Sequence, residues 1–274
     1  MLNVLNMQLY RLRKSKLFWA MFIVCAALPF VGMLFFKGLL AFVDGAFEGA
    51  LTDVLDSLQS SFTMSAFTGL SQLGSDPVLF SIICSSIFLS GEFSGGAIRN
   101  MILANKSRTQ IFFSFFSISM IIGLSYLGAG YASTLLFYGL ALGFEGLTVT
   151  QAISGCAAAL FIGILSIAIA QACVCMFLFA TRKTGTTVAF PILVVVLVPS
   201  IINAVVDIVA GVRILTGEMV SAEALSWIPL YNLGMFASSD VDGALVGKIA
   251  LYNIPLAALL AFFGWLAIDR ADLK

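Results

Sequence analysis

Long apolar runs, separated by short polar stretches, fill the chain from residue 17 to residue 268. A helix that crosses the hydrocarbon core of a bilayer needs about 20 mostly apolar residues. Six runs reach or approach this length, and they predict spans over residues 17–43, 67–91, 111–142, 152–181, 187–207 and 249–268. The pattern therefore predicts an all-α integral membrane protein, a single transmembrane domain with six transmembrane helices.

The second run is short, because its apolar part covers only Pro77–Gly91. The helix therefore either begins upstream, near Phe67, or is broken at Asp76-Pro77, where Asp can cap and Pro can start a helix. Pro29 predicts a kink in the first span, and the fifth span contains Pro191 and Pro199.

Small residues recur four apart in two of the predicted spans. Gly155, Ala159 and Gly163 have this spacing in the fourth span, and Gly128 and Ala132 repeat it in the third. Such spacing lets helix backbones approach closely. We favour packing within one chain over a specific dimer face.

The composition agrees with a membrane location. The chain is 61% hydrophobic and 10% charged, whereas a soluble domain carries about 25% charged residues. Its net charge is zero, so no bulk positive charge points to nucleic acid. The chain has no histidine, and its five cysteines all fall in apolar stretches, where they are expected to act as small hydrophobes. The first run is longer than the core of a cleavable signal, so we expect it to be retained.

The cations predict the orientation. If the N-terminus is cytoplasmic, 11 of the 14 Lys and Arg residues lie on the cytoplasmic side, and 11 of the 14 acids lie on the other side. Lys and Arg near span ends concentrate on the cytoplasmic side. The sequence therefore predicts a multi-pass membrane protein with both termini in the cytoplasm.

Residues 1–16 form an amphipathic pattern. Leu2, Leu5, Leu9 and Leu12 share one helical face, and cations gather at Arg11, Arg13, Lys14 and Lys16. This pattern predicts an interfacial helix beside anionic lipids. Its role is either a membrane anchor or a docking surface for a partner.

Two segments on the outer side are too long for simple connectors. Residues 44–75 carry an apolar stripe and several acids, which predicts a surface helix that caps the bundle or acts as a gate. Residues 208–248 contain an apolar, aromatic stretch with Trp227, Pro229 and Tyr231. This stretch is too short for two spans, and re-entrant or interfacial helices are the natural alternative.

The predicted spans contain almost no ionisable residues. Their deeper polar groups are neutral, namely Ser81, Ser85, Ser86, Gln171 and Asn203. Carriers driven by protons or sodium usually have acids near mid-membrane. The chain also has no GxxxxGK[ST] phosphate loop and no catalytic constellation. If the protein moves a molecule uphill, the energy is expected to come from a partner.

Residues 92–110 form the one sizeable loop on the cytoplasmic side. Ala97–Leu103 can form a short helix with Ile98, Met101 and Ile102 on one side. Gly95 and Gly96 precede it and allow a sharp turn. Glu92 lies just upstream, where a negative charge suits the positive end of a helix. A solvated loop that only fixes topology would not need this amphipathic turn.

This loop resembles that of the type-2 permease subunits of ATP-binding cassette transporters, in particular small bacterial ones associated with drug and antimicrobial-peptide export or immunity. The family motif reads Glu-aromatic-x-x-Gly-Thr-Ile-Lys/Arg-Asn, followed by Ser-Arg and a hydrophobe. The matching positions are Glu92, Phe93, Gly95, Gly96, Ile98, Arg99, Asn100, Ser107, Arg108 and Ile111. The chain departs at Ala97, where Thr is common, and at Asn105-Lys106, where Pro is common.

The resemblance implies a protein of the bacterial plasma membrane. It also implies that the loop is a coupling helix, which rests in a groove of a separate ATPase subunit. Two permease subunits, identical or sister chains, would work with two ATPases, and ATP and Mg²⁺ would bind to the ATPases. Ile98, Met101 and Ile102 would make apolar contacts, and Glu92 and Arg99 polar ones. Tyr10, Arg11 and Arg13 would support the docking from the N-terminal helix. Trp227, Pro229 and Tyr231 would belong to the family's outer re-entrant helices.

The expected function is therefore export of a lipophilic or amphipathic molecule, such as an antimicrobial peptide, driven by a partner ATPase. The direction of transport rests on the resemblance alone. An ATPase-independent channel or secondary carrier is the alternative, but it would be expected to carry intramembrane charges. A membrane-embedded enzyme has no catalytic constellation to support it.

Overall fold

The computed structural model describes residues 2–46, 75–94, 101, 107–142, 149–202, 205 and 243–270. Nearly all of these residues are helical, and no strand occurs among them. Six helical segments in this part of the chain are long and apolar enough to cross a membrane. The prediction of an all-α membrane protein with six spans is therefore confirmed.

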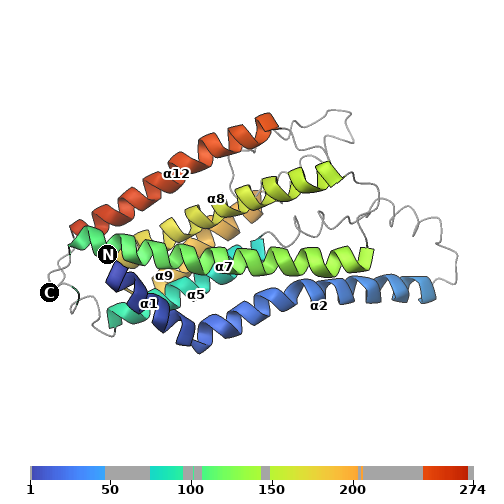
Figure 1. Cartoon of the computed structure of the whole chain (residues 1–274), viewed down its shortest axis with the longest axis horizontal. Helices are drawn as coiled ribbons and strands as arrows, with labels where there is room; N and C mark the ends of the chain where they lie inside the picture. Colours follow the sequence, from blue (N-terminus) through green and yellow to red (C-terminus); the bar gives the residue numbers. More distant parts are fainter. Residues whose placement is uncertain are drawn as a thin grey trace.

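The helices run side by side along the long axis of the molecule (Figure 1). A short helix, α1, precedes the first span, and α1 and the last turn of α12 lie at the same end of the bundle, here called the α1 end. The fifth span joins α9 to a π-helical segment, η1. The elements are α1 (Leu2–Lys14), α2 (Lys16–Ala46), α5 (Ser75–Ser94), α7 (Arg108–Leu142), α8 (Val149–Thr181), α9 (Thr184–Pro191), η1 (Ile192–Leu197) and α12 (Gly243–Asp269).

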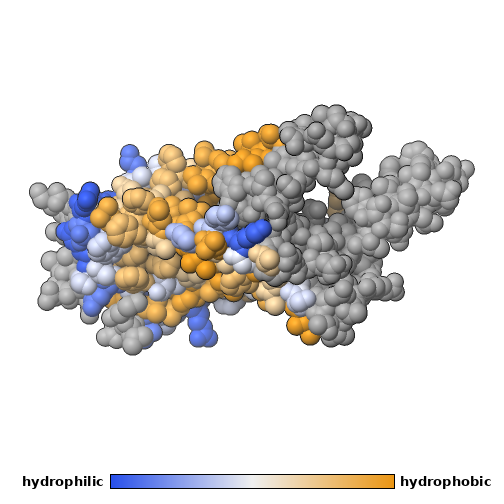
Figure 2. All heavy atoms as spheres, turned by 90° about the horizontal axis from the view of Figure 1, so that it is seen from above, coloured by the Kyte–Doolittle hydropathy of each residue, from blue (hydrophilic) through white to orange (hydrophobic). Residues whose placement is uncertain are grey.

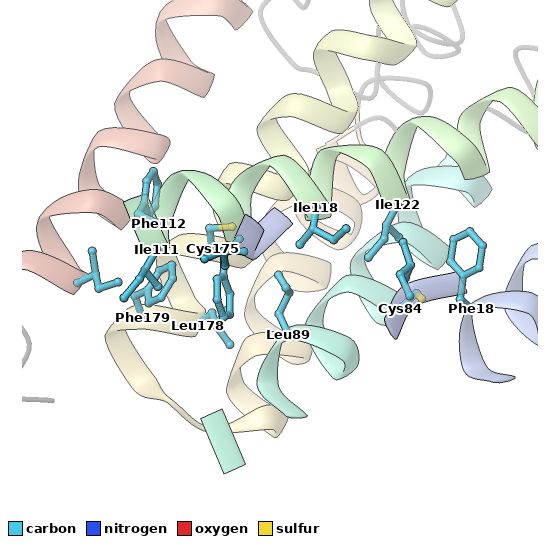
Figure 3. Packing of buried hydrophobic residues seen from close by; sticks show 14 of the residues in the cluster. Phe18, Cys84, Leu89, Ile111, Phe112, Ile118, Ile122, Cys175, Leu178 and Phe179 are labelled. Carbon is cyan, nitrogen blue, oxygen red and sulfur yellow. The ribbon is translucent and has the colours of Figure 1, made fainter. Parts of the chain in front are cut away.

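Three spans form the centre of the bundle. More than half of the most apolar stretch of α5, α7 and α8 is buried, against less than a quarter in α2, the α9–η1 span and α12. Near the α1 end, Leu89 of α5, Phe115 of α7 and Leu178 of α8 are fully buried in one cluster. Figure 3 shows this cluster between the three helices. This core packs the three central spans against one another at the α1 end.

The outer spans expose large apolar side chains. Phe35 of α2, Ile201 of the fifth span and Leu251 of α12 are each at least 60% exposed. In Figure 2, apolar residues cover most of the described surface in the middle of the molecule, and hydrophilic residues gather at the α1 end. Soluble monomers rarely expose an apolar surface of this extent. Lipid is the solvent that suits it.

The small residues of α8 pack against α7 within the same chain. A Cβ on Gly163 would lie 2.9 Å from Leu127 Cδ1 and 2.9 Å from Tyr131 Oη. The Tyr131 hydroxyl donates to the carbonyl of Ala159 over 3.2 Å. The spacing around Gly163 therefore serves intramolecular helix packing.

The fifth span is tied to α5 where a proline interrupts it. Pro191 has no N–H to donate to the carbonyl of Thr187, four residues earlier. The Ser86 hydroxyl of α5 donates to that carbonyl over 2.9 Å. After Pro191 the helix widens to the π form over Ile192–Leu197. A single hydroxyl thus satisfies the carbonyl that the proline leaves free and joins two spans.

The two long segments predicted on the outer side lie mostly outside the described residues. Of residues 44–75, only 44–46 and Ser75 are described, at the ends of α2 and α5. The stretch with Trp227, Pro229 and Tyr231 is not among the described residues. The gate and re-entrant helices stay predictions.

Candidate functional site

The residues predicted to couple the protein to a partner gather at the α1 end. Glu92 and Phe93 lie in the last turn of α5, Met101 follows, and Arg108 begins α7. Tyr10, Arg11 and Arg13 lie in the last turns of α1. Gly95, Gly96, Ile98, Arg99, Asn100 and Ile102 lie outside the described residues.

An ion pair joins α1 to the end of α5. The Arg11 guanidinium Nη1 lies 2.6 Å from both carboxylate oxygens of Glu92. The Glu92 side chain is only 2% exposed, whereas that of Arg11 is 49% exposed. Glu92 lies at the C-terminal end of α5, where the helix dipole disfavours a negative charge. Arg11 supplies the positive charge that a buried carboxylate needs there.

Phe93 anchors the same turn of α5 in an aromatic cluster. Its ring centroid lies 6.3 Å from that of Phe115 on α7 and 5.6 Å from that of Phe179 on α8. Phe112 also packs against Phe179, with centroids 5.7 Å apart. Edge-on and tilted aromatic contacts in this distance range are favourable. The root of the loop that begins at Glu92 is therefore fixed to both neighbouring central helices.

One face of α1 packs onto the bundle. Val4, Gln8 and Leu12, spaced four apart, are buried. Met101 is 6% exposed and belongs to the same apolar cluster as Val4 and Leu12. Its side chain thus packs on the bundle in this state. Of the predicted apolar face, Leu12 is buried, and Leu5 and Leu9 are partly buried and pack against the same cluster. Val4 and Gln8 extend the buried face beyond the predicted one.

The opposite face of α1 is exposed and basic. Tyr10 is 60% exposed, and the Lys14 ammonium lies 4.5 Å from the centre of its ring. Arg13 is also exposed. These residues leave a cationic and aromatic surface beside the Arg11–Glu92 pair, available to a lipid head group or a protein partner.

The corner between α1 and α2 is held by local hydrogen bonds. Ser15 separates the helices, and its Oγ accepts from the N–H of Phe18 over 3.4 Å. The Trp19 indole N–H donates to the carbonyl of Arg13 over 2.9 Å. The Tyr126 hydroxyl of α7 donates to the carbonyl of Phe18 over 3.0 Å. These bonds fix the direction in which α1 leaves the first span.

Arg108, at the other root of the loop, contacts a different helix. Its Nη1 donates to the carbonyl of Ile268 over 3.4 Å and also to that of Asp269. Both carbonyls belong to the last turn of α12. Sequence reasoning missed these partners, because a bond to backbone carbonyls leaves no signature in residue type.

Apart from Glu92, the buried polar side chains among the described residues are neutral, and most of their hydroxyls donate to carbonyls three or four residues earlier in the chain. The Gln171 amide of α8 donates to Ser81 Oγ of α5 over 3.0 Å, and Ser81 in turn donates to the carbonyl of Val78 over 2.7 Å. In the part of the chain that the structure describes, no three His, Cys, Asp or Glu side chains cluster in a way that could hold a metal ion.

Residues 4–203 match the family model described as "ABC-2 family transporter protein". No curated protein sequence matches the chain, and no solved structure matches it. The matched range covers α1 from its third residue onward, the first five candidate spans and the whole of the loop between α5 and α7.

Proposed function

This chain belongs to the ABC-2 family of transporter proteins, which makes it a membrane permease subunit of an ABC transporter, and we propose that it exports a lipophilic or amphipathic molecule with energy from a separate ATPase. The ATPase docks at the α1 end, on the loop of residues 92–110. ATP and Mg²⁺ bind in the ATPase and not in this chain. The α1 end faces the cytoplasm of a bacterial cell, as the distribution of cations favours.

The observation that carries the proposal is the ion pair between Arg11 and Glu92. The loop begins at the end of α5, and this pair binds the end of α5 to α1. Phe93 binds the same turn of α5 to α7 and α8. A push on the loop therefore acts on packed spans rather than on a free connector. Interfaces of packed helices respond to such a push by rigid-body movement.

The loop residues divide between two surfaces in this proposal. Met101 packs on the cluster that contains Val4 and Leu12, and so holds the loop against the bundle. Ile98 and Ile102, which lie about 60° and about 100° around the expected short helix from Met101, contact the ATPase together with the polar groups of Arg99 and Asn100. Gly95 and Gly96 turn the chain between the two surfaces.

The working unit contains two permease subunits, either two copies of this chain or this chain and a sister subunit. The substrate is inferred from the lining that such spans can offer. The exposed side chains of the described spans are mainly aromatic and aliphatic. This lining suits an amphipathic molecule such as an antimicrobial peptide or a lipid-like drug.

The test is co-purification from the native membrane. The tagged chain is expected to retain a soluble ATPase, and Ile98→Asp together with Ile102→Asp is expected to release it. The matched control, Ile98→Val with Ile102→Val, keeps an apolar face and should retain the ATPase. An ATPase that stays bound to the Asp variant would contradict the proposed docking surface. A chain that moves its substrate without any ATPase would favour a channel or secondary carrier instead.

A further inference from the structure

The last turn of α12 is fastened to the first turn of α7 by two separate contacts. Arg108 donates to the carbonyls of Ile268 and Asp269. One residue later, Thr109 Oγ1 accepts from the indole N–H of Trp265 over 3.3 Å. The loop of residues 92–110 returns to the bundle at this first turn of α7. Both contacts therefore join the end of the loop to the end of the sixth span.

The same end of α12 also lies close to α8. A Cβ on Gly264 would be 3.1 Å from Phe112 Cε2, 3.2 Å from the backbone nitrogen of Met176 and 3.3 Å from its Cα. Such close approach to the backbone of Met176 leaves little room for a side chain at that position. Ile268, four residues later, is fully buried. The end of α12 therefore packs closely against both α7 and α8.

Arg108 suits this contact through its charge and shape. The C-terminal end of a helix carries a partial negative charge on its last carbonyls, which have no partner within the helix. A guanidinium offers several donors in a fixed plane, so one side chain can reach two carbonyls at once. A solvated cation that only set the topology would not need to bind them.

The residues at the two ends of the loop thus bind α1 and α12, the first and last helices of the described chain. Glu92, at the first root, binds α1 through Arg11. Arg108, at the second root, binds α12. We propose that Arg108 is a positioning residue that passes movement of the loop to the sixth span, so that α12 follows the loop as α1 does. This inference rests on the proposed function, because it takes the loop to be the point where the ATPase acts.

The test compares two places in one sample by hydrogen exchange. The full complex with its co-purified ATPase, in lipid nanodiscs, is measured with and without a non-hydrolysable ATP analogue. Peptides that cover residues 92–107 report on the loop, and peptides that cover 262–270 report on the end of α12. In the unmodified protein the analogue is expected to change exchange at both places.

Arg108→Gln is expected to keep the response of the loop and to reduce the response of α12 about fivefold, as loss of a charge-assisted hydrogen bond at a partly exposed site implies. Arg270→Gln removes the neighbouring cation and leaves the Arg108 contact in place, so both responses should persist. If Arg108→Gln lowers the yield of folded complex, Arg108→Lys gives the same comparison with a smaller expected loss.

The outcomes separate this inference from the proposed function. No response at residues 92–107 in the unmodified complex would overturn the proposed function, and this inference with it. A response at the loop with an undiminished response of α12 in Arg108→Gln would overturn the role of Arg108 alone. If Arg108→Gln changes the exchange of α12 by the same amount with and without the analogue, the role of Arg108 is purely structural. This result would also contradict the proposal.

Discussion

Arg11 and Glu92, which lie 81 residues apart in the chain, form an ion pair in which one guanidinium nitrogen lies 2.6 Å from both carboxylate oxygens. The pair is asymmetric, since Glu92 is buried and Arg11 is half exposed. Burying a carboxylate without a partner is costly, whereas leaving an arginine in water is not. The two residues therefore differ in what their removal does.

Arg11→Gln is expected to lower the free energy of unfolding by about 2 kcal/mol, because it leaves the Glu92 carboxylate buried without its cation. Adding Glu92→Gln to this variant should recover part of the loss, because the uncompensated charge disappears. Thermal unfolding of the purified protein in detergent measures both effects. Arg13→Gln removes an exposed cation from the same turn of α1 and should change stability by less than about 0.5 kcal/mol. A double variant less stable than Arg11→Gln would contradict this account of the pair.

Ser86→Ala is expected to destabilise the protein by about 1 kcal/mol, because it leaves the carbonyl of Thr187 without a donor. Pro191→Ala restores a backbone N–H that can reach this carbonyl. The cost of Ser86→Ala should therefore shrink in the Pro191→Ala background, and a double-mutant cycle of unfolding temperatures measures the difference. An equal cost of Ser86→Ala in both backgrounds would show that the hydroxyl does not replace the missing N–H.

Gly264→Ala is expected to destabilise the protein by about 1–3 kcal/mol. The added methyl group would press against the backbone of Met176, so α12 and α8 would have to move apart. Gly247 lies on the same helix, and a Cβ there would meet nothing within 4 Å. Gly247→Ala should therefore cause no loss of stability. Chemical unfolding of both variants in mixed micelles tests the contrast, and similar losses in the two would count against close packing of α12 on α8.

The spans were predictable from the sequence because hydrophobic length alone marks a membrane helix. The pairing of Arg11 with Glu92 was not, although the family resemblance placed both residues in one functional region. Helical periodicity relates residues a few positions apart and gives no information about residues 81 positions apart. On α1 the sequence pattern marked Leu5, Leu9 and Leu12, which pack against the core cluster, but it did not mark Val4 or the polar Gln8, which are also buried.

The hydrogen bonds that join the spans were hidden for a related reason. Pro191 is visible in the sequence as a residue that leaves a carbonyl without its helical donor. Several serines of α5, among them Ser81, Ser85 and Ser86, could have donated to that carbonyl. Only the rotation of α5 about its axis selects Ser86, while Ser85 bonds to carbonyls of its own helix. Likewise, Arg108 binds backbone carbonyls, which every residue has, so the composition of α12 gives no sign of the contact.

The central claim is that a separate ATPase drives this permease through the loop of residues 92–110. The most direct measurement is the ATP hydrolysis rate of the co-purified ATPase in lipid nanodiscs, alone, with the unmodified permease and with the Ile98→Asp, Ile102→Asp variant. The account predicts that the permease changes the rate and that the variant returns it to the rate of the ATPase alone. A rate that is the same in all three samples, or a variant that changes it as the unmodified permease does, would contradict the claim.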